Sequence, residues 1–125
     1  MNDNEENVKD KSYRFALRII KLYRFLCDKK KEYVLSKQIL RSGTSIGANI
    51  EEASAGQSRK DFLAKMSIAS KEARETLYWL KLLRDSDYLE DKLAKSLIDD
   101  TEELVKMLTS IVKTTQKSIK KITKN

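Results

Sequence analysis

The lack of proline in a chain of 125 residues is the feature that most constrains its fold. Proline inside a helix removes a backbone hydrogen bond and clashes with the preceding turn, so a chain without it can form long unbroken helices. Apolar residues recur at intervals of three and four rather than alternating, which is typical of amphipathic helices. A single domain of this length can bury a hydrophobic core without a metal or disulfide. The sequence therefore predicts an all-α fold.

The apolar spacing predicts four helices, at residues 11–30, 33–55, 58–84 and 89–117. The third begins with a capping signal, because the Ser58 hydroxyl can accept a backbone N–H and Asp61 favours the positive end of the helix dipole. Short connections between such helices predict an antiparallel, up-down four-helix bundle over residues 11–117. Residues 1–10 are expected to form a flexible acidic N-terminus and residues 118–125 a basic, fraying tail.

The first predicted helix has a wider apolar arc than one packing seam needs. Phe15 and Ile19 lie on one stripe, Ile20 lies on an adjacent stripe, and a basic face with Phe25 lies opposite. On the fourth predicted helix the apolar spacing continues as far as Ile122. The excess apolar surface suggests that part of it is buried between subunits.

Missing residue types exclude several classes of function. Without histidine there is no Ser-His-Asp triad, imidazole base or His-ligated zinc. The one cysteine, Cys27, forms no internal disulfide and fits a reducing, cytoplasmic compartment. The three glycines match no nucleotide-binding loop, and no apolar run is long enough to span a membrane. We expect a non-enzymatic protein without metal, cofactor or membrane contact.

Positive charge is concentrated in two blocks. Residues 11–41 carry 10 basic and 2 acidic side chains, and residues 113–125 carry 5 lysines and no acid. Basic blocks of this kind are the electrostatic footprint of a polyanion binder, so we predict contacts to RNA or DNA phosphates. The candidate contact residues are Arg14, Arg18, Lys21, Arg24, Lys29, Lys30, Lys31, Lys117, Lys120 and Lys121.

Hydrogen-bonding side chains form a second candidate site. On the second predicted helix they make a continuous stripe, and two carboxylates of the third helix lie within or beside an apolar flank, where a cationic partner is expected. A wet surface is one interpretation; the other is a polar network or subunit contact in which Arg41 and Glu52 satisfy each other and neighbouring helices. The residues of this site are Arg41, Ser45, Asn49, Glu52, Glu72 and Glu75.

The same region resembles a known family. Arg41, Ser45-Ile46, Asn49-Ile50-Glu51-Glu52, Lys60-Asp61-Phe62 and Tyr88-Leu89 match the pattern of four helix bundle proteins encoded within intervening sequences of bacterial large-subunit (23S) ribosomal RNA genes. The match is close over the second and third predicted helices and weakest over the fourth. The family is also similar to the accessory variability determinant of diversity-generating retroelements.

The resemblance implies a bundle that assembles as a homopentameric barrel with a basic surface and no assigned catalytic activity. It also implies nucleic acid as a partner, and a reverse transcriptase or other polymerase as a possible protein partner. A protein-interaction hub is therefore the alternative to direct nucleic-acid binding. A remote alternative is a magnesium-dependent nucleotide pyrophosphatase, because Glu72-x-x-Glu75 and Asp99-x-x-Glu102 form two acidic pairs of the kind that hold hard cations.

Overall fold

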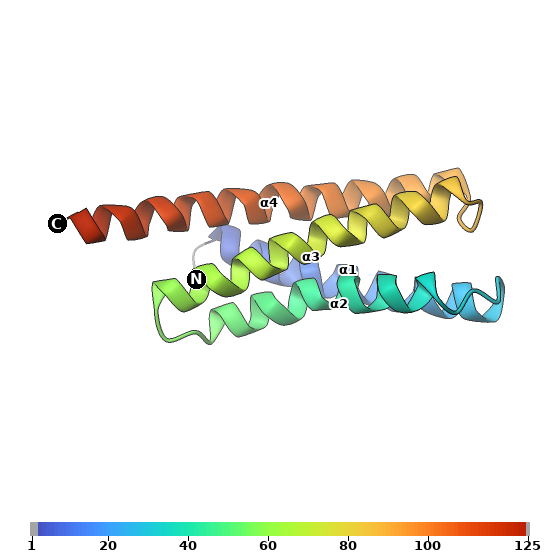
Figure 1. Ribbon diagram of the computed structural model, residues 1–125, viewed down its shortest axis with the longest axis horizontal. Helices are drawn as coiled ribbons and strands as arrows, with labels where there is room; N and C mark the ends of the chain where they lie inside the picture. Colours follow the sequence, from blue (N-terminus) through green and yellow to red (C-terminus); the bar gives the residue numbers. More distant parts are fainter. Residues whose placement is uncertain (1–2, 125) are drawn as a thin grey trace.

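Four α-helices make up the computed structural model, which describes residues 3–124 apart from the side chains of residues 6, 123 and 124. Their bounds are α1 (Asp3–Asp28), α2 (Leu35–Ser54), α3 (Arg59–Asp85) and α4 (Asp91–Lys124). The helices alternate in direction, and each packs against its two neighbours around the bundle (Figure 1). The described residues contain no strand. The predicted all-α four-helix bundle is confirmed.

Both ends of the chain differ from the sequence prediction. Helix α1 begins at Asp3 instead of residue 11, and Glu5 and Val8 are buried, so the first turns of α1 pack against the bundle. Helix α4 continues to Lys124 in place of a tail that starts at residue 118. Nothing in this lysine-rich stretch breaks a helix, and positive charge near a helix C-terminus is favourable because of the helix dipole.

The helix ends show one predicted cap and one that the sequence analysis missed. At the start of α3, the Ser58 hydroxyl accepts a hydrogen bond from the Asp61 backbone N–H at 3.1 Å, which confirms the predicted cap. At the start of α2, the buried Glu32 carboxylate accepts from the Ser36 N–H at 2.7 Å and the Val34 N–H at 3.3 Å. A charged side chain from the preceding loop thus satisfies N–H groups that have no partner within the helix.

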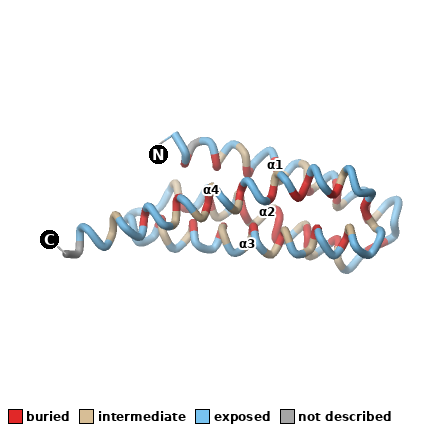
Figure 2. The backbone as a smooth tube through the Cα atoms, turned by 90° about the horizontal axis from the view of Figure 1, so that it is seen from above, coloured by how far each residue is buried: buried red, intermediate tan, exposed pale blue. Residues whose placement is uncertain are grey.

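The core runs along the axis of the bundle. Figure 2 shows buried residues repeating along the inner sides of the helices. Phe15, Ile19, Ile46 and Leu104 are among them, whereas Ile122 is 65% exposed because it lies beyond Thr115, the last of the described side chains of α4 that is buried. The apolar spacing that reaches Ile122 in the sequence therefore does not mark a core position there.

Helices α1 and α2 approach each other closely at a glycine. A Cβ atom on Gly43 would lie 2.8 Å from both Cγ1 and Cγ2 of Ile19, well inside van der Waals contact. One turn later, a Cβ atom on Gly47 would lie 3.4 Å from the Ser12 Oγ, which is ordinary contact. Gly43 is thus the position at which α2 must lack a side chain for α1 to dock. In the described part of the chain, no helix is both long enough and apolar enough to cross a bilayer.

Candidate nucleic-acid interface

The basic face of α1 turns toward α4. Arg18 donates to Asp100 Oδ2 at 2.6 Å and to Ser96 Oγ at 3.0 Å, and Lys11 Nζ lies 3.0 Å from Glu103 Oε2. The α4 acids that face α1 are Asp100 and Glu103, so α4 presents a negative surface to this side of α1. Arg18 is therefore engaged in holding the two helices together.

The basic face lies against α4 because of the way α1 is rotated about its own axis in the bundle. Its stripe through Phe15 and Ile19 fills the core, while Tyr13 and Leu17 on another side are 64% and 48% exposed. With this orientation the basic face lies along the seam with α4 instead of pointing directly away from the bundle. The sequence did not determine this rotation, because either of two adjacent apolar stripes could face the core.

The other basic residues predicted on α1 lie further out. Arg14 pairs with Asp10 one turn earlier at 3.0 Å, and both side chains are 69% exposed. Lys21 and Arg24 are exposed and form no salt bridge with any residue that the structure describes. Lys21 also lines a hollow between α1 and α4 together with Phe25.

Exposed lysines follow α1 in the loop to α2. Lys29, Lys30 and Lys31 all face solvent, and Lys30 Nζ lies 5.8 Å from the ring centroid of Phe25. Figure 1 shows that this loop and the C-terminus of α4 lie at opposite ends of the bundle. The predicted contact residues of the two basic blocks therefore do not form one continuous surface.

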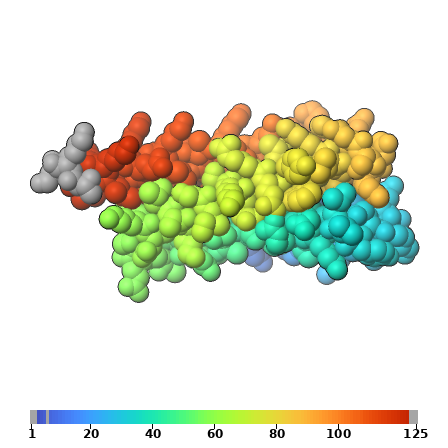
Figure 3. Space-filling view, in the orientation of Figure 1, coloured from blue at the N-terminus to red at the C-terminus, as the bar shows by residue number. Residues whose placement is uncertain are grey.

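Helix α4 is divided into an acidic and a basic half. Between Asp91 and Glu103 it carries five acids and two lysines, and after Glu103 it carries no acid at all. Exposed lysines at intervals of seven and four residues share one side of α4, and α4 forms the long upper edge of the molecule in Figure 3. They are Lys106, Lys113, Lys117 and Lys121.

Lys117, Lys120 and Lys121 were predicted contact residues, and the structure places them at the C-terminal end of α4. Lys106 and Lys113 were missed, although the intervals of seven and four residues between positions 106, 113 and 117 would have shown that these lysines lie on the same side of the helix. Together with Thr109 and Ser110, Lys106 and Lys113 line a shallow hollow along α4. Hydroxyl groups and lysines in one groove are suited to contacting phosphate oxygens.

The polar residues of the second candidate site join α2 to α3. Arg41 donates to Glu72 Oε2 at 3.2 Å and also contacts Glu75. Glu75 Oε2 in turn accepts from Trp79 Nε1 at 3.0 Å. Below this cluster, the buried hydroxyls of Thr76 and Ser42 are 3.0 Å apart.

The remaining residues of that site lie apart from the cluster. Ser45 and Asn49 donate to backbone carbonyl oxygens one turn earlier on their own helix, at 2.6 and 2.8 Å. Glu52 pairs with Lys65 of α3 at 2.7 Å. The expected mutual pairing of Arg41 with Glu52 is wrong, because each finds its partner on α3.

The two acidic pairs considered for magnesium do not meet. Glu72 and Glu75 lie at the α2–α3 seam against Arg41, whereas Asp99 lies on α4 and accepts from Lys95 Nζ at 2.9 Å. Among the side chains that the structure describes, no group of three or more Asp, Glu or Cys residues is arranged to hold a metal ion.

In three pairs of neighbouring residues, a hydrogen bond shifts the pKa of a side chain. The hydrogen bond to Asp99 raises the pKa of Lys95, and the hydrogen bond from Arg84 lowers the pKa of Asp85. The side-chain hydrogen bond with Cys27 raises the pKa of Tyr23. All three leave the group in the charge state it normally has at neutral pH, so none indicates an acid or base poised for catalysis.

The model of the 23S rRNA-intervening sequence protein family matches residues 4–110. The chain belongs to this family. A crystal structure of an S23 ribosomal protein family member of unknown function, from Bacteroides thetaiotaomicron, superposes with a TM-score of 0.86. The two sequences are 55% identical, and the superposition covers 88% of this chain and 98% of the other. None of the curated proteins matches the chain.

The family match has a boundary that matters for the basic surface. It ends at residue 110, so Lys113, Lys117 and Lys121 lie outside the part shared with the 23S rRNA-intervening sequence protein family model. Arg41, Glu72 and Glu75 lie inside it. The matched residues therefore include the polar cluster of the bundle, and the most basic stretch of α4 follows them.

Proposed function

We propose that this protein binds RNA, without catalysing a reaction on it, through the basic half of α4. The observation that carries the proposal is the row Lys106, Lys113, Lys117 and Lys121 on one side of a helix that has no acid after Glu103. Lysine ammonium groups that approach phosphates displace condensed counterions, which makes association favourable and dependent on salt. Membership of a family described by an rRNA intervening sequence makes RNA the first ligand to test.

Such contacts position a nucleic acid without reading its bases. Lysine acts as a point charge on a flexible stem and binds a phosphate in many orientations. The hydroxyls of Thr109, Ser110 and Thr114 in the same hollow can donate to phosphate oxygens. We expect affinity for RNA of different sequences to be similar and to fall steeply with salt.

The test is RNA binding by fluorescence anisotropy between about 50 and 200 mM salt. The double variant Lys113→Gln/Lys117→Gln should weaken binding about tenfold at the lower salt and reduce the slope of log affinity against log salt by about 1.5. The matched control, Lys9→Gln/Lys37→Gln, removes the same charge from α1 and α2 and should change binding less than about threefold. Salt-insensitive binding, or equal losses in both variants, would contradict the proposal.

We further propose that the protein assembles with copies of itself through the outer side of α1. Tyr13 and Leu17 are 64% and 48% exposed there, and Ile20 lies half-buried beside them. Exposed apolar residues grouped on one helix face are suited to contacting another subunit. Five subunits of 14.5 kDa each are the assembly that the family resemblance leads us to expect.

Light scattering measures this mass directly. The substitution Leu17→Glu should reduce the mass to that of one chain, because it places a charge in an apolar contact, while the helical circular dichroism is unchanged. Leu82→Glu is the matched control, since Leu82 is an exposed leucine on another helix, α3, at 36%. A monomeric unsubstituted protein, or dissociation by both variants, would overturn the assembly proposal.

A further inference from the structure

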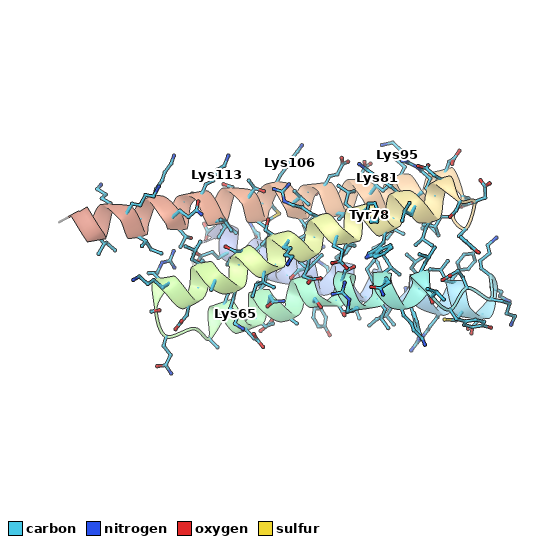
Figure 4. All side chains as sticks on the ribbon, in the orientation of Figure 1. Lys65, Tyr78, Lys81, Lys95, Lys106 and Lys113 are labelled. Carbon is cyan, nitrogen blue, oxygen red and sulfur yellow. The ribbon has the colours of Figure 1, made fainter. Side chains whose placement is uncertain are left out.

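Basic side chains on α3 widen the α4 row into a larger surface. Arg74 donates to Thr109 of α4 at 3.1 Å, so this side of α3 lies directly along the hollow of α4. Figure 4 shows Tyr78 and Lys81 on α3, Lys95 toward the same end of the bundle on α4, and Lys106 and Lys113 further along α4. We define the α3–α4 face by six residues: Arg74, Tyr78, Lys81, Lys95, Lys106 and Lys113.

Basic side chains outnumber acidic ones on this face. Five of its six residues are basic, and the acids next to them are Asp99, which accepts from Lys95 at 2.9 Å, Glu102, and Asp85 beside Lys81. From Lys95 to Lys113 the face spans 18 residues of helix, or about 27 Å at 1.5 Å per residue. That length accommodates several nucleotides of an extended strand.

Tyr78 is an exposed aromatic ring within this basic surface. It is 57% exposed, and its centroid lies 5.2 Å from that of Trp79 at an interplanar angle of 65°. Trp79 is itself fixed, because its Nε1 donates to Glu75, which also contacts Arg41. The Tyr78 ring therefore stands on a rigid support and loses little conformational freedom when a ligand stacks on it.

We propose that the α3–α4 face binds a single-stranded segment of RNA, with an unpaired base stacked on Tyr78 and the flanking phosphates on the lysines. The inference rests on the proposed function and specifies its ligand. Bases within a duplex are paired and stacked on each other, so a duplex offers this face only backbone groups. An aromatic ring among lysines gains additional binding energy only from a base that is free to stack.

The chain contains its own probe for this contact. Trp79 is the sole tryptophan and lies against Tyr78, so a base stacked on Tyr78 should change Trp79 fluorescence. The experiment titrates the full chain with a 12-nucleotide pyrimidine RNA and with a duplex of the same length. Fluorescence of Trp79 and anisotropy of the labelled RNA are recorded in the same titration.

Removing the ring should weaken single-strand binding selectively. Tyr78→Leu should lower affinity for the single strand about tenfold and abolish the fluorescence change, while duplex affinity changes less than about twofold. Tyr78→Phe keeps the stacking surface and should retain both signals. The matched control is Tyr33→Leu, because Tyr33 is 53% exposed and follows the lysines of the α1–α2 loop.

Each result separates this inference from the function on which it rests. Equal losses for single strand and duplex in Tyr78→Leu, or a loss in Tyr33→Leu without one in Tyr78→Leu, would overturn the stacking site while leaving RNA binding intact. Unsubstituted protein that binds neither RNA would overturn both. Normal melting of Tyr78→Leu in circular dichroism excludes unfolding as the cause of a loss.

Discussion

The two basic regions of the molecule, on α1 and at the end of α4, differ in what surrounds them. Arg18 and Lys11 of α1 reach carboxylates on the acidic half of α4. Lys113 and Lys117 lie more than two turns beyond the last acid of α4. They form no salt bridge with any described residue. Similar residue types thus hold two helices together in one region and remain available to a ligand in the other.

The difference shows that positive charge must be judged together with the acids that face it. A basic side chain that pairs with an acid of the neighbouring helix, as Arg18 does, contributes to packing, and its charge is largely neutralised before any polyanion arrives. A basic stretch that continues beyond the last acid of its helix, as α4 does after Glu103, retains its positive electrostatic potential. If the two regions differ in this way, substitutions on α1 should change the free energy of unfolding, and substitutions at the end of α4 should change RNA affinity.

The largest effect is expected where α1 meets α2. Gly43→Ala should lower the free energy of unfolding by about 1–2 kcal/mol, because the new methyl group overlaps Ile19, and this cost exceeds the helical gain of alanine over glycine. Gly47→Ala is the matched control and should be neutral or stabilising by up to about 1 kcal/mol, since its methyl group fits beside Ser12. Urea denaturation measures both; equal effects would show that close approach at Gly43 does not position α1.

A smaller effect is expected at the seam with α4. Arg18→Gln should lower the free energy of unfolding by about 1 kcal/mol, because it breaks a hydrogen-bonded ion pair whose two side chains are 35% and 36% exposed and therefore partly screened. RNA affinity should change less than about twofold. Lys117→Gln should show the reverse pattern, with unchanged stability and weaker binding. A large loss of RNA binding in Arg18→Gln would break the comparison between the two regions.

The smallest effect is expected at Arg14. Its pair with Asp10 is exposed and lies within a single helix, so Arg14→Gln should cost only about 0.3–0.5 kcal/mol. Thermal denaturation should show a shift of about 1–3 °C. A loss as large as that of Arg18→Gln would mean that the ion pairs between helices carry no special share of the stability.

Local features of the fold were predictable from the sequence because they depend on near neighbours. Helix positions follow from apolar spacing, and the Ser58 cap follows from the serine and the aspartate three residues later. The start of α1 was not predictable from the acidic composition of residues 1–10, because it depends on where Val8 packs in the assembled bundle. The continuation of α4 past residue 117 does not depend on packing, since no described side chain after Thr115 is buried; the stretch has no helix breaker, and its positive charge is favourable at a helix C-terminus.

Ion pairs between helices were the least predictable feature. Arg18 and Asp100 are 82 residues apart, and only the rotation of α1 brings them together. Arg41 and the acids of α3 were each identified from the sequence, but the pattern on one helix suggested Glu52 as the partner. Glu52→Gln should therefore cost less than about 1 kcal/mol, because the Glu52–Lys65 pair is exposed.

The end of α4 extends beyond the packed core of the bundle. Thr115 is the last described side chain that is buried, and the helix continues for two more turns in the direction of the C-terminus (Figure 1). Lengthening or shortening this overhang by one turn would move its terminal charges by about 5.4 Å without repacking the core. A protein built in this way can change how far it extends toward a partner while its stability stays constant.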